Sequence, residues 1–463
     1  MGSSTSPSDR HPAVRWAVLL LVSLVMGANY YAYDALSSIK ALLQSELGIT
    51  SEQYGVIVSF YSVPNTFLLM TVFGGIILDR IGIRRTGLLF NLCCALGVIV
   101  TAYGASDTFR AGGPLHGLFG SFLTAYSPEL KMMILGRLLF GLGAETSIVV
   151  INKTMARWFR ERELAFAFAV NLAVARLGTA LALQASPRLI HAPWGWTTAI
   201  WAAALLMSLG FLAFVVYVVI DRWLTGDEMQ RGLLAEDERF RLTDIRDLLT
   251  NRAFLYISAL CVTFYSAIFP FQAFCPDLLH HKFGLSLEAS GDLTSLIVWA
   301  TILFTPLFGF VVDRVGRRAT LMMLGSGILL VSHTLLALTT IPPWLPIFAL
   351  GIALSLVPAA MWPGVALVVS ERRLGTAYGV MTSIQNLGMF AFPILAGRIT
   401  DLANPGVDPT QGGVLDYTWT VLMFAGLGLV GFVFAVLLHG AARRPEYRAL
   451  ELRARELGGG ATG

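Results

Sequence analysis

Long apolar stretches separated by short polar segments make up most of this 463-residue chain. A run of about 20 apolar residues is long enough to cross a bilayer as a helix. The pattern predicts twelve spans, at 14–34, 53–78, 86–104, 132–155, 163–186, 196–220, 253–275, 288–312, 319–341, 345–369, 374–401 and 417–439. We therefore expect an all-α integral membrane protein.

A short polar motif occurs twice between these spans. Residues 75–85 read GIILDRIGIRR and residues 309–318 read GFVVDRVGRR, about half the chain apart. The glycines permit tight turns. The aspartates, Asp79 and Asp313, stand at predicted helix ends, where backbone charge and nearby arginines can hold them. Because each copy follows one span and precedes another, the duplication predicts two pseudo-symmetric six-helix bundles.

The duplication also predicts how the chain is organised. Its parts are an N-terminal tail (1–13), a first bundle (14–220), a connector (221–252), a second bundle (253–440) and a C-terminal tail (441–463). The connector mixes charges with spaced leucine and phenylalanine residues, which predicts a short amphipathic helix at the membrane surface.

Composition and charge agree with a membrane protein. Hydrophobic residues make up 56% and charged residues 13%, whereas soluble domains carry about 25% charge. Most lysines and arginines fall in loops on one side, so the positive-inside rule predicts that both termini are cytoplasmic. The net charge of +4 follows from this asymmetry and indicates no nucleic-acid partner.

The residue types give no sign of an enzyme. The four cysteines lie in apolar runs without metal-binding spacing, so we interpret them as small buried hydrophobic residues. The sequence shows no nucleophile–base pair, metal cluster or phosphate-binding loop. We expect neither a cofactor nor a metal.

Two charged residues of opposite sign lie near the middle of adjacent predicted spans. Glu145 is in the fourth span and Arg176 in the fifth, where a charge costs about 2.5–3.5 kcal/mol and needs a partner or a wet cavity. Both lie about 18–20 Å from the predicted cytoplasmic end, at 1.5 Å per residue. Such a pair can bind a zwitterion, with the amine at Glu145 and the carboxylate at Arg176. The alternative is a structural ion pair that locks the two helices.

Further polar and aromatic residues are predicted to line a cavity in several helices, although any single aromatic ring can equally be packing. These candidates are Tyr30, Tyr61, Asn65, Tyr265, Trp362, Gln385 and Asn386. Aromatic rings with a few amides suit a cavity that accepts varied side chains.

A second set is predicted to control conformational change rather than to bind substrate. It comprises Asp79, Arg80, Arg84, Arg85, Asp313, Arg314, Arg317, Arg318 and Arg137. Asp79 and Asp313, with their arginines, are expected to stabilise the outward-open state. Arg137 precedes glycines that permit close helix packing, so we expect it to hold helices together. Lys153 is interpreted as a lysine whose ammonium reaches the interface, and His333 as a structural residue.

The duplicated motif resembles the signature loop of the major facilitator superfamily, which joins the second and third helices of each half. The chain more closely resembles the lysosomal dipeptide uniporters of that superfamily and their bacterial relatives. The segments that carry this resemblance are NYYAYD (29–34), GRLLFGLGAE (136–145), RWFRERELAFAF (157–168), ARLG (175–178), FPF (269–271) and LGTAYGVMTSIQNLG (374–388).

The resemblance implies alternating-access movement of dipeptides without obligatory ion coupling. It also implies that the family's fourth-helix acid and fifth-helix arginine, here Glu145 and Arg176, handle substrate. Animal members depend on a glycosylated single-pass partner and an N-terminal dileucine signal, and this N-terminal tail has no such signal. Arginine strongly outnumbers lysine, which suggests a GC-rich genome. We therefore expect a bacterial inner membrane protein that functions as a monomer in the lipid bilayer.

Two other functions stay open on the residues alone. A proton-coupled symporter or exporter of another small organic anion, zwitterion or drug could use the same arginine, with Glu145 titrating if it is desolvated. A non-transporting sensor or scaffold with this fold is the second, and appended sensory sequence would favour it.

Overall fold

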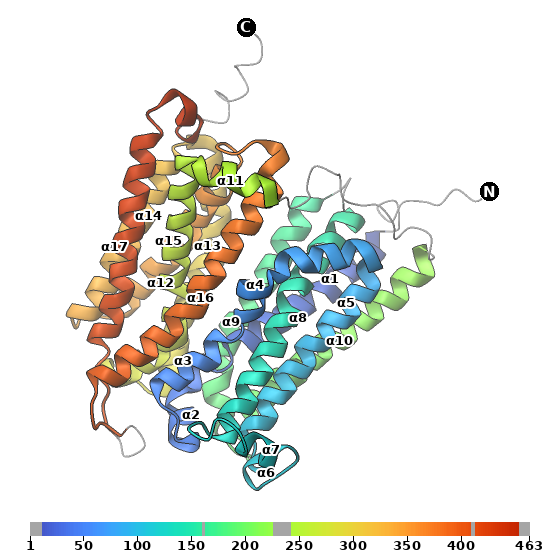
Figure 1. The fold of residues 1–463 in the computed structure, drawn as a ribbon, viewed down its shortest axis with the longest axis vertical. Helices are drawn as coiled ribbons and strands as arrows, with labels where there is room; N and C mark the ends of the chain where they lie inside the picture. The colour runs from blue at the N-terminus through green and yellow to red at the C-terminus, as the bar shows by residue number, and fades with distance from the viewer. Residues whose placement is uncertain (1–11, 160–162, 226–241, 409–412, 453–463) are drawn as a thin grey trace. The chain divides into compact units, whose positions relative to one another are not determined.

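The computed structural model describes residues 12–159, 163–225, 242–408 and 413–452, and those residues form helices and no strands (Figure 1). They form two compact units. In the described part, unit 1 comprises 12–49 and 56–225, and unit 2 comprises 50–55 and 242–452. Most of the predicted N-terminal tail, half of the connector and the end of the C-terminal tail lie outside the described residues.

Unit 1 consists of the helices before the connector. They are α1 (Pro12–Asp34), η2 (Ser37–Ile39), α2 (Lys40–Leu47), α3 (Ser51–Ser59), α4 (Val63–Leu68), α5 (Met70–Ala105), α6 (Asp107–Arg110), α7 (His116–Gly120), α8 (Pro128–Phe159), α9 (Leu164–Leu189) and α10 (Thr198–Thr225). The first residues of α3 belong to unit 2.

Unit 2 consists of the helices after the connector. They are α11 (Leu242–Thr250), α12 (Arg252–Phe283), α13 (Leu287–Val315), α14 (Arg318–Leu338), α15 (Trp344–Val365), η5 (Glu371–Arg373), α16 (Leu374–Ala403), α17 (Thr418–Ala441) and η7 (Pro445–Leu450). The short α11 supplies the helix expected in the connector, with Leu248 buried and its neighbours exposed.

The two units repeat one packing plan. In unit 1, α1 packs against α9 and α10, α10 packs against α5, and α5 packs along α8. In unit 2, α12 packs against α16 and α17, α17 packs against α14, and α13 and α14 pack against α15. Each unit therefore pairs its first helix with its fifth and sixth helices, and its third helix with its sixth. The structure thus repeats the plan that the duplicated motif predicted.

The prediction of one continuous second span at 53–78 is wrong. That segment is divided among α3, α4 and the start of α5. Pro64 stands near the start of α4, and proline cannot donate the backbone hydrogen bond that would continue the preceding helix. The second interruption is at Leu69, whose φ is 50°. Asn65 supports this break, because its Oδ1 accepts hydrogen bonds from Thr71 N at 2.9 Å and Thr71 Oγ1 at 2.6 Å.

The predicted third span at 86–104 lies in the second part of α5, after a kink. The helix α5 runs through the first motif copy and is interrupted there at Gly82, which has φ 82° and ψ 165°. Only glycine adopts such values readily. With α5 counted once although Gly82 divides it, eleven helices in the described part are long and apolar enough to cross a membrane. The other predicted spans agree with observed helices to within several residues.

Candidate functional site

The last turns of α1 bring tyrosines toward charged residues of unit 1. Tyr30 and Tyr33 are three residues apart and share one face of the helix. The Arg176 guanidinium on α9 lies 5.9 Å from the centre of the Tyr30 ring. Tyr30 is also within electrostatic reach of Glu145 on α8. One ring of α1 therefore interacts with the acid and the base that the sequence predicts near the middle of adjacent spans.

Tyr61 binds Glu145 directly. It lies in the break between α3 and α4, and its Oη donates a hydrogen bond to Glu145 Oε1 at 3.2 Å. Its ring packs edge-on against Tyr33, with ring centres 4.7 Å apart. The break between α3 and α4 therefore positions a tyrosine that orients the Glu145 carboxylate.

Arg137 has a different role from Arg176. It is 3% exposed, and its two terminal nitrogens donate to Ala32 O at 3.1 Å and Tyr33 O at 3.2 Å. The last carbonyls of a helix lack partners within that helix. Arg137 therefore caps the end of α1 from α8, and so joins the two helices.

We call Tyr30, Tyr33, Tyr61, Arg137, Glu145 and Arg176 the charge–tyrosine cluster. Within it, Tyr30, Tyr61, Glu145 and Arg176 are only partly buried. A partly exposed acid and a partly exposed base on neighbouring helices can each accept an opposite charge from a ligand. Arg137, in contrast, uses its charge within the protein.

Unit 2 brings together a second group of predicted site residues. Trp362 Nε1 on α15 donates to Tyr265 Oη on α12 at 3.0 Å. Tyr378 Oη on α16 donates to Trp362 O at 3.2 Å. Gln385 accepts a long hydrogen bond from Cys261 Sγ at 3.8 Å. Tyr378 and Cys261 were not among the sequence candidates, since nothing in their context distinguishes them from packing residues.

Two of the residues predicted to bind substrate form hydrogen bonds within the protein instead. Asn65 is fully buried at the break before α5. Asn386 is also buried, and its Nδ2 donates to Thr382 O one turn earlier at 3.0 Å. These hydrogen bonds use polar atoms that a substrate would otherwise contact. Gln385 differs from the two asparagines because it is partly exposed.

The first motif copy is held by residues outside the motif. Asp79 pairs with Lys153 Nζ on α8 at 2.5 Å, so Lys153 is more than a lysine reaching the interface. Arg84 Nε lies 2.6 Å from Asp221 Oδ2, and Arg157 lies 3.6 Å from the same oxygen. Asp221 is fully buried on α10. The sequence offered no signal for it, because it stands where the connector was expected to begin. Arg80 and Arg85 are exposed.

The second motif copy has different surroundings. Asp313, Arg314 and Arg317 are exposed, and Arg318 is buried. The start of α14 is held by the C-terminal segment, because Glu451 accepts hydrogen bonds from Thr320 N and Thr320 Oγ1, both at 3.0 Å. His439 on α17 lies 3.5 Å from Glu451.

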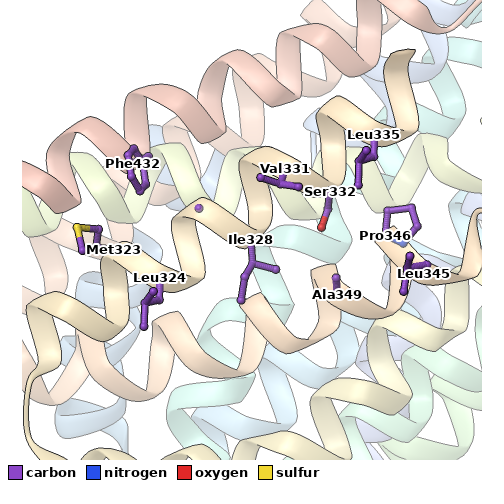
Figure 2. A pocket seen from close by; sticks show the side chains of 11 residues that line it. Met323, Leu324, Ile328, Val331, Ser332, Leu335, Leu345, Pro346, Ala349 and Phe432 are labelled. Carbon is purple, nitrogen blue, oxygen red and sulfur yellow. The ribbon is translucent and has the colours of Figure 1, made fainter. Parts of the chain in front are cut away.

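The described residues contain no group of three or more metal-ligating side chains. Unit 2 has an apolar groove of about 500 Å³ along α14, α15 and α17 (Figure 2), whereas the charge–tyrosine cluster belongs to unit 1. Its lining carries almost no polar atoms, so it does not suit a zwitterion.

Two helical units with one packing plan, a duplicated polar motif and a charged cluster at span depth define a two-bundle membrane transporter. The chain belongs to the Major Facilitator Superfamily, which it matches over residues 19–276 and 271–458. It is an integral multi-pass membrane protein, as its composition predicted.

Among curated proteins, the chain is 31% identical over 405 residues to the lysosomal dipeptide transporter MFSD1 of Bos taurus, covering 84% of this chain and 80% of that protein. The human protein of the same name is 30% identical over 403 residues, with the same coverage. The hexuronate transporter of Bacillus subtilis is 23% identical over 436 residues, covering 91% of this chain and 95% of that one.

Solved structures share the fold at low identity. A bacterial homologue of the human lysosomal transporter Spinster, inward-facing and occupied, has a TM-score of 0.69 and 13% identity, covering 93% of this chain and 97% of that chain. The nucleoside transporter NupG has a TM-score of 0.68 and 14% identity, covering 92% and 99%. These structures support the fold and carry no information on substrate.

Proposed function

We propose that this chain transports dipeptides by facilitated diffusion. The observation that carries the proposal is the partly exposed acid and base of unit 1, Glu145 and Arg176, which both interact with Tyr30. The names of the relatives at about 30% identity support the same substrate class.

The cluster offers complementary chemistry for a zwitterionic peptide. The Glu145 carboxylate would bind the peptide's ammonium group, and the Arg176 guanidinium would bind its carboxylate through two parallel hydrogen bonds. Tyr61 would keep the Glu145 carboxylate oriented through its hydrogen bond. Tyr30 would contribute an aromatic face beside the bound ends. Gln385, Tyr265 and Trp362 stay candidate contacts for side chains.

Glu145→Gln and Arg176→Ala should each weaken binding of a dipeptide at least about tenfold, since a hydrogen bond to a charged group contributes about 1.5–3 kcal/mol. Binding would be measured by the ligand-dependent rise in melting temperature of the purified protein, and transport by uptake into proteoliposomes. Acetylation of the peptide's amine should reduce binding to the wild type, and amidation of its carboxylate should do the same.

Matched controls lie on the same helices. Glu129→Gln changes an acid of α8 that pairs with His116 at 3.4 Å. Arg188→Ala changes an arginine of α9 whose guanidinium donates to the carbonyl of Gln184. Both controls should keep wild-type uptake. Normal uptake by Glu145→Gln and Arg176→Ala would contradict the proposal that these two residues bind the substrate.

A second candidate substrate class is a small organic anion. A lone cavity arginine suits a carboxylate, and one relative is named a hexuronate transporter. Competition separates the two classes, because a dipeptide site should respond to peptides with two free termini and not to sugar acids. Melting temperatures measured with both ligand sets would decide between them.

Facilitated diffusion also has a direct test. A zwitterion can replace each charge partner of the cluster without carrying a proton. We therefore expect a neutral dipeptide to reach equal concentrations on both sides of the membrane and not to accumulate on one side. Proteoliposomes would be given a pH gradient and no substrate gradient. Accumulation of the dipeptide under these conditions would show proton symport instead of uniport.

A further inference from the structure

The apolar groove on unit 2 is a feature that the transport site does not use. Figure 2 shows its lining side chains following α14, from Met323 at one end to Leu335 at the other, with Ala349 of α15 and Phe432 of α17 at its sides. The only polar side chain in the lining is that of Ser332.

Small residues create the hollow. Gly327 has no side chain, and a Cβ placed there would lie 3.5 Å from the Phe432 ring, an ordinary contact distance. Leu324 and Val331 flank the hollow and are 53% and 55% exposed. The groove is therefore a depression between exposed apolar side chains on helices that are long and apolar enough to cross a membrane.

The length of the groove matches one leaflet. Met323 and Leu335 are twelve residues apart on α14, which corresponds to about 18 Å at 1.5 Å per residue. One leaflet contributes about half of the roughly 30 Å hydrocarbon core. An extended acyl chain from a single leaflet can therefore lie along the groove.

A cation stands at one end of the groove. Lys282 Nζ donates to Leu336 O at 2.6 Å and to Ala337 O at 2.7 Å, next to the groove residue Leu335. A lysine ammonium has three donors, so a third can reach a phosphate. Trp344, 54% exposed, begins α15 at this end, and tryptophan favours the level of lipid headgroups.

The local charge also limits the kind of headgroup. Asp416 acts electrostatically on Lys282, so this end of the groove carries both signs of charge. A headgroup with a phosphate and an ammonium fits such an environment better than a purely anionic one. The lipid would come from the leaflet at the Leu338 end of α14.

We propose that the groove on α14, α15 and α17 is a phospholipid site. One acyl chain lies between Met323 and Leu335, and the phosphate of a zwitterionic headgroup binds Lys282. Hydrocarbon burial provides most of the binding, Lys282 binds the phosphate, and Asp416 favours a headgroup that also carries an ammonium group. The site is independent of which solute the charge–tyrosine cluster accepts.

The test fills the groove without changing its backbone. Gly327→Leu places a side chain in the hollow, and Gly426→Leu places the same side chain at an exposed position of α17 with nothing within 4 Å of its Cβ. Purified proteins would be delipidated and titrated with phosphatidylethanolamine, phosphatidylglycerol or diacylglycerol, and bound lipid counted by native mass spectrometry. Wild type and Gly426→Leu should retain one phosphatidylethanolamine tightly. Gly327→Leu should bind it at least tenfold more weakly, because the acyl chain would lose the burial of about two methylene groups.

The headgroup has its own control. Lys282→Gln should weaken phosphatidylethanolamine binding about fivefold, in line with about 1 kcal/mol per basic residue near a lipid surface, and should leave diacylglycerol binding unchanged. Lys131→Gln, a lysine of unit 1 that also donates to a backbone carbonyl, should change neither. Equal lipid binding by Gly327→Leu and Gly426→Leu would overturn the site. Unchanged phosphatidylethanolamine binding by Lys282→Gln, or tighter binding of phosphatidylglycerol by the wild type, would overturn the headgroup assignment.

Discussion

The two copies of the duplicated motif are alike in sequence and differ in what holds them. In unit 1 the third helix is held by a carboxylate of the sixth helix, since Asp221 on α10 binds Arg84 beside Arg157. In unit 2 the carboxylate comes from the C-terminal segment, where Glu451 binds Thr320 at the start of α14. The repeated motif therefore forms a turn between helices in both units. The carboxylate that holds the following helix comes from a different part of the chain in each unit.

The aspartates of the motif differ in the same way. Both aspartates are exposed, and Asp79 pairs with Lys153 across to α8. The neighbouring Arg314 lies over the Phe310 ring of its own helix, 4.1 Å from the ring centre. The first copy therefore connects two helices of its unit through charge, and the second copy relies on the tail.

The largest expected difference concerns the buried carboxylate. Asp221→Asn leaves Arg84 and Arg157 buried without their shared anion, and breaking a buried ion pair costs about 3–5 kcal/mol. The melting temperature of the purified protein should fall clearly. Asp107→Asn is the control, because its side chain is 84% exposed in its pair with Arg110 and exposed pairs contribute at most about 1 kcal/mol. Equal melting temperatures for the two variants would show that Asp221 is not the support we describe.

A smaller loss is expected at the tail. Glu451→Ala removes the side chain that caps α14, and such caps contribute about 0.5–2 kcal/mol. Thermal unfolding should detect the loss, and Glu446→Ala, which changes an exposed residue of η7, should not reproduce it. If removing Glu451 costs as much as removing the Asp221 charge, the two copies are more equivalent than their contacts suggest.

The smallest effect on stability is expected at Asp79. Its replacement should mainly lower the rate of transport. Asp79→Asn breaks a partly exposed pair and should reduce folding stability by about 1 kcal/mol or less. We expect it to shift the population toward the inward-open state, which lowers the uptake rate while ligand affinity changes little. Lys153→Met should act in the same direction, with less than additive effect in the double variant.

Asp313→Asn provides the matching test in unit 2. Because Asp313 is exposed, its replacement should leave the melting temperature unchanged, so any fall in uptake would reflect gating alone. Single-cysteine probes at the motif end of each unit would report access. Unchanged access in Asp79→Asn would contradict the gating role of the first copy.

The sequence was sufficient for the helices and for the repeat, because both depend on long apolar runs and on glycines at fixed places. It was insufficient for the second span. No charged residue interrupts 53–78, and the helix is broken by Pro64 together with a side-chain hydrogen bond to Asn65. A hydropathy profile detects neither the proline nor the side-chain hydrogen bond.

The candidate site was predictable where a charge had no reason to be in a membrane. Glu145 and Arg176 were identifiable on that ground alone, and the structure places both near Tyr30. Lys153, Asp221 and Glu451 were not identifiable, because each stands near the end of an apolar run or in a tail, where charged residues are common. Their importance comes from partners far away in sequence.

The six residues 50–55 have a consequence for how the protein could be divided. They lie within the first sequence half but pack in unit 2, where Ser51 N and Glu52 N donate to the Asp401 carboxylate at 2.9 and 2.8 Å and Tyr54 Oη donates to Ala273 O at 3.0 Å. A gene cut at the connector would therefore yield a second fragment that lacks part of its own interior. Such fragments should be recovered together when they are produced in the same cell, and the second should be poorly soluble in detergent when it is produced alone.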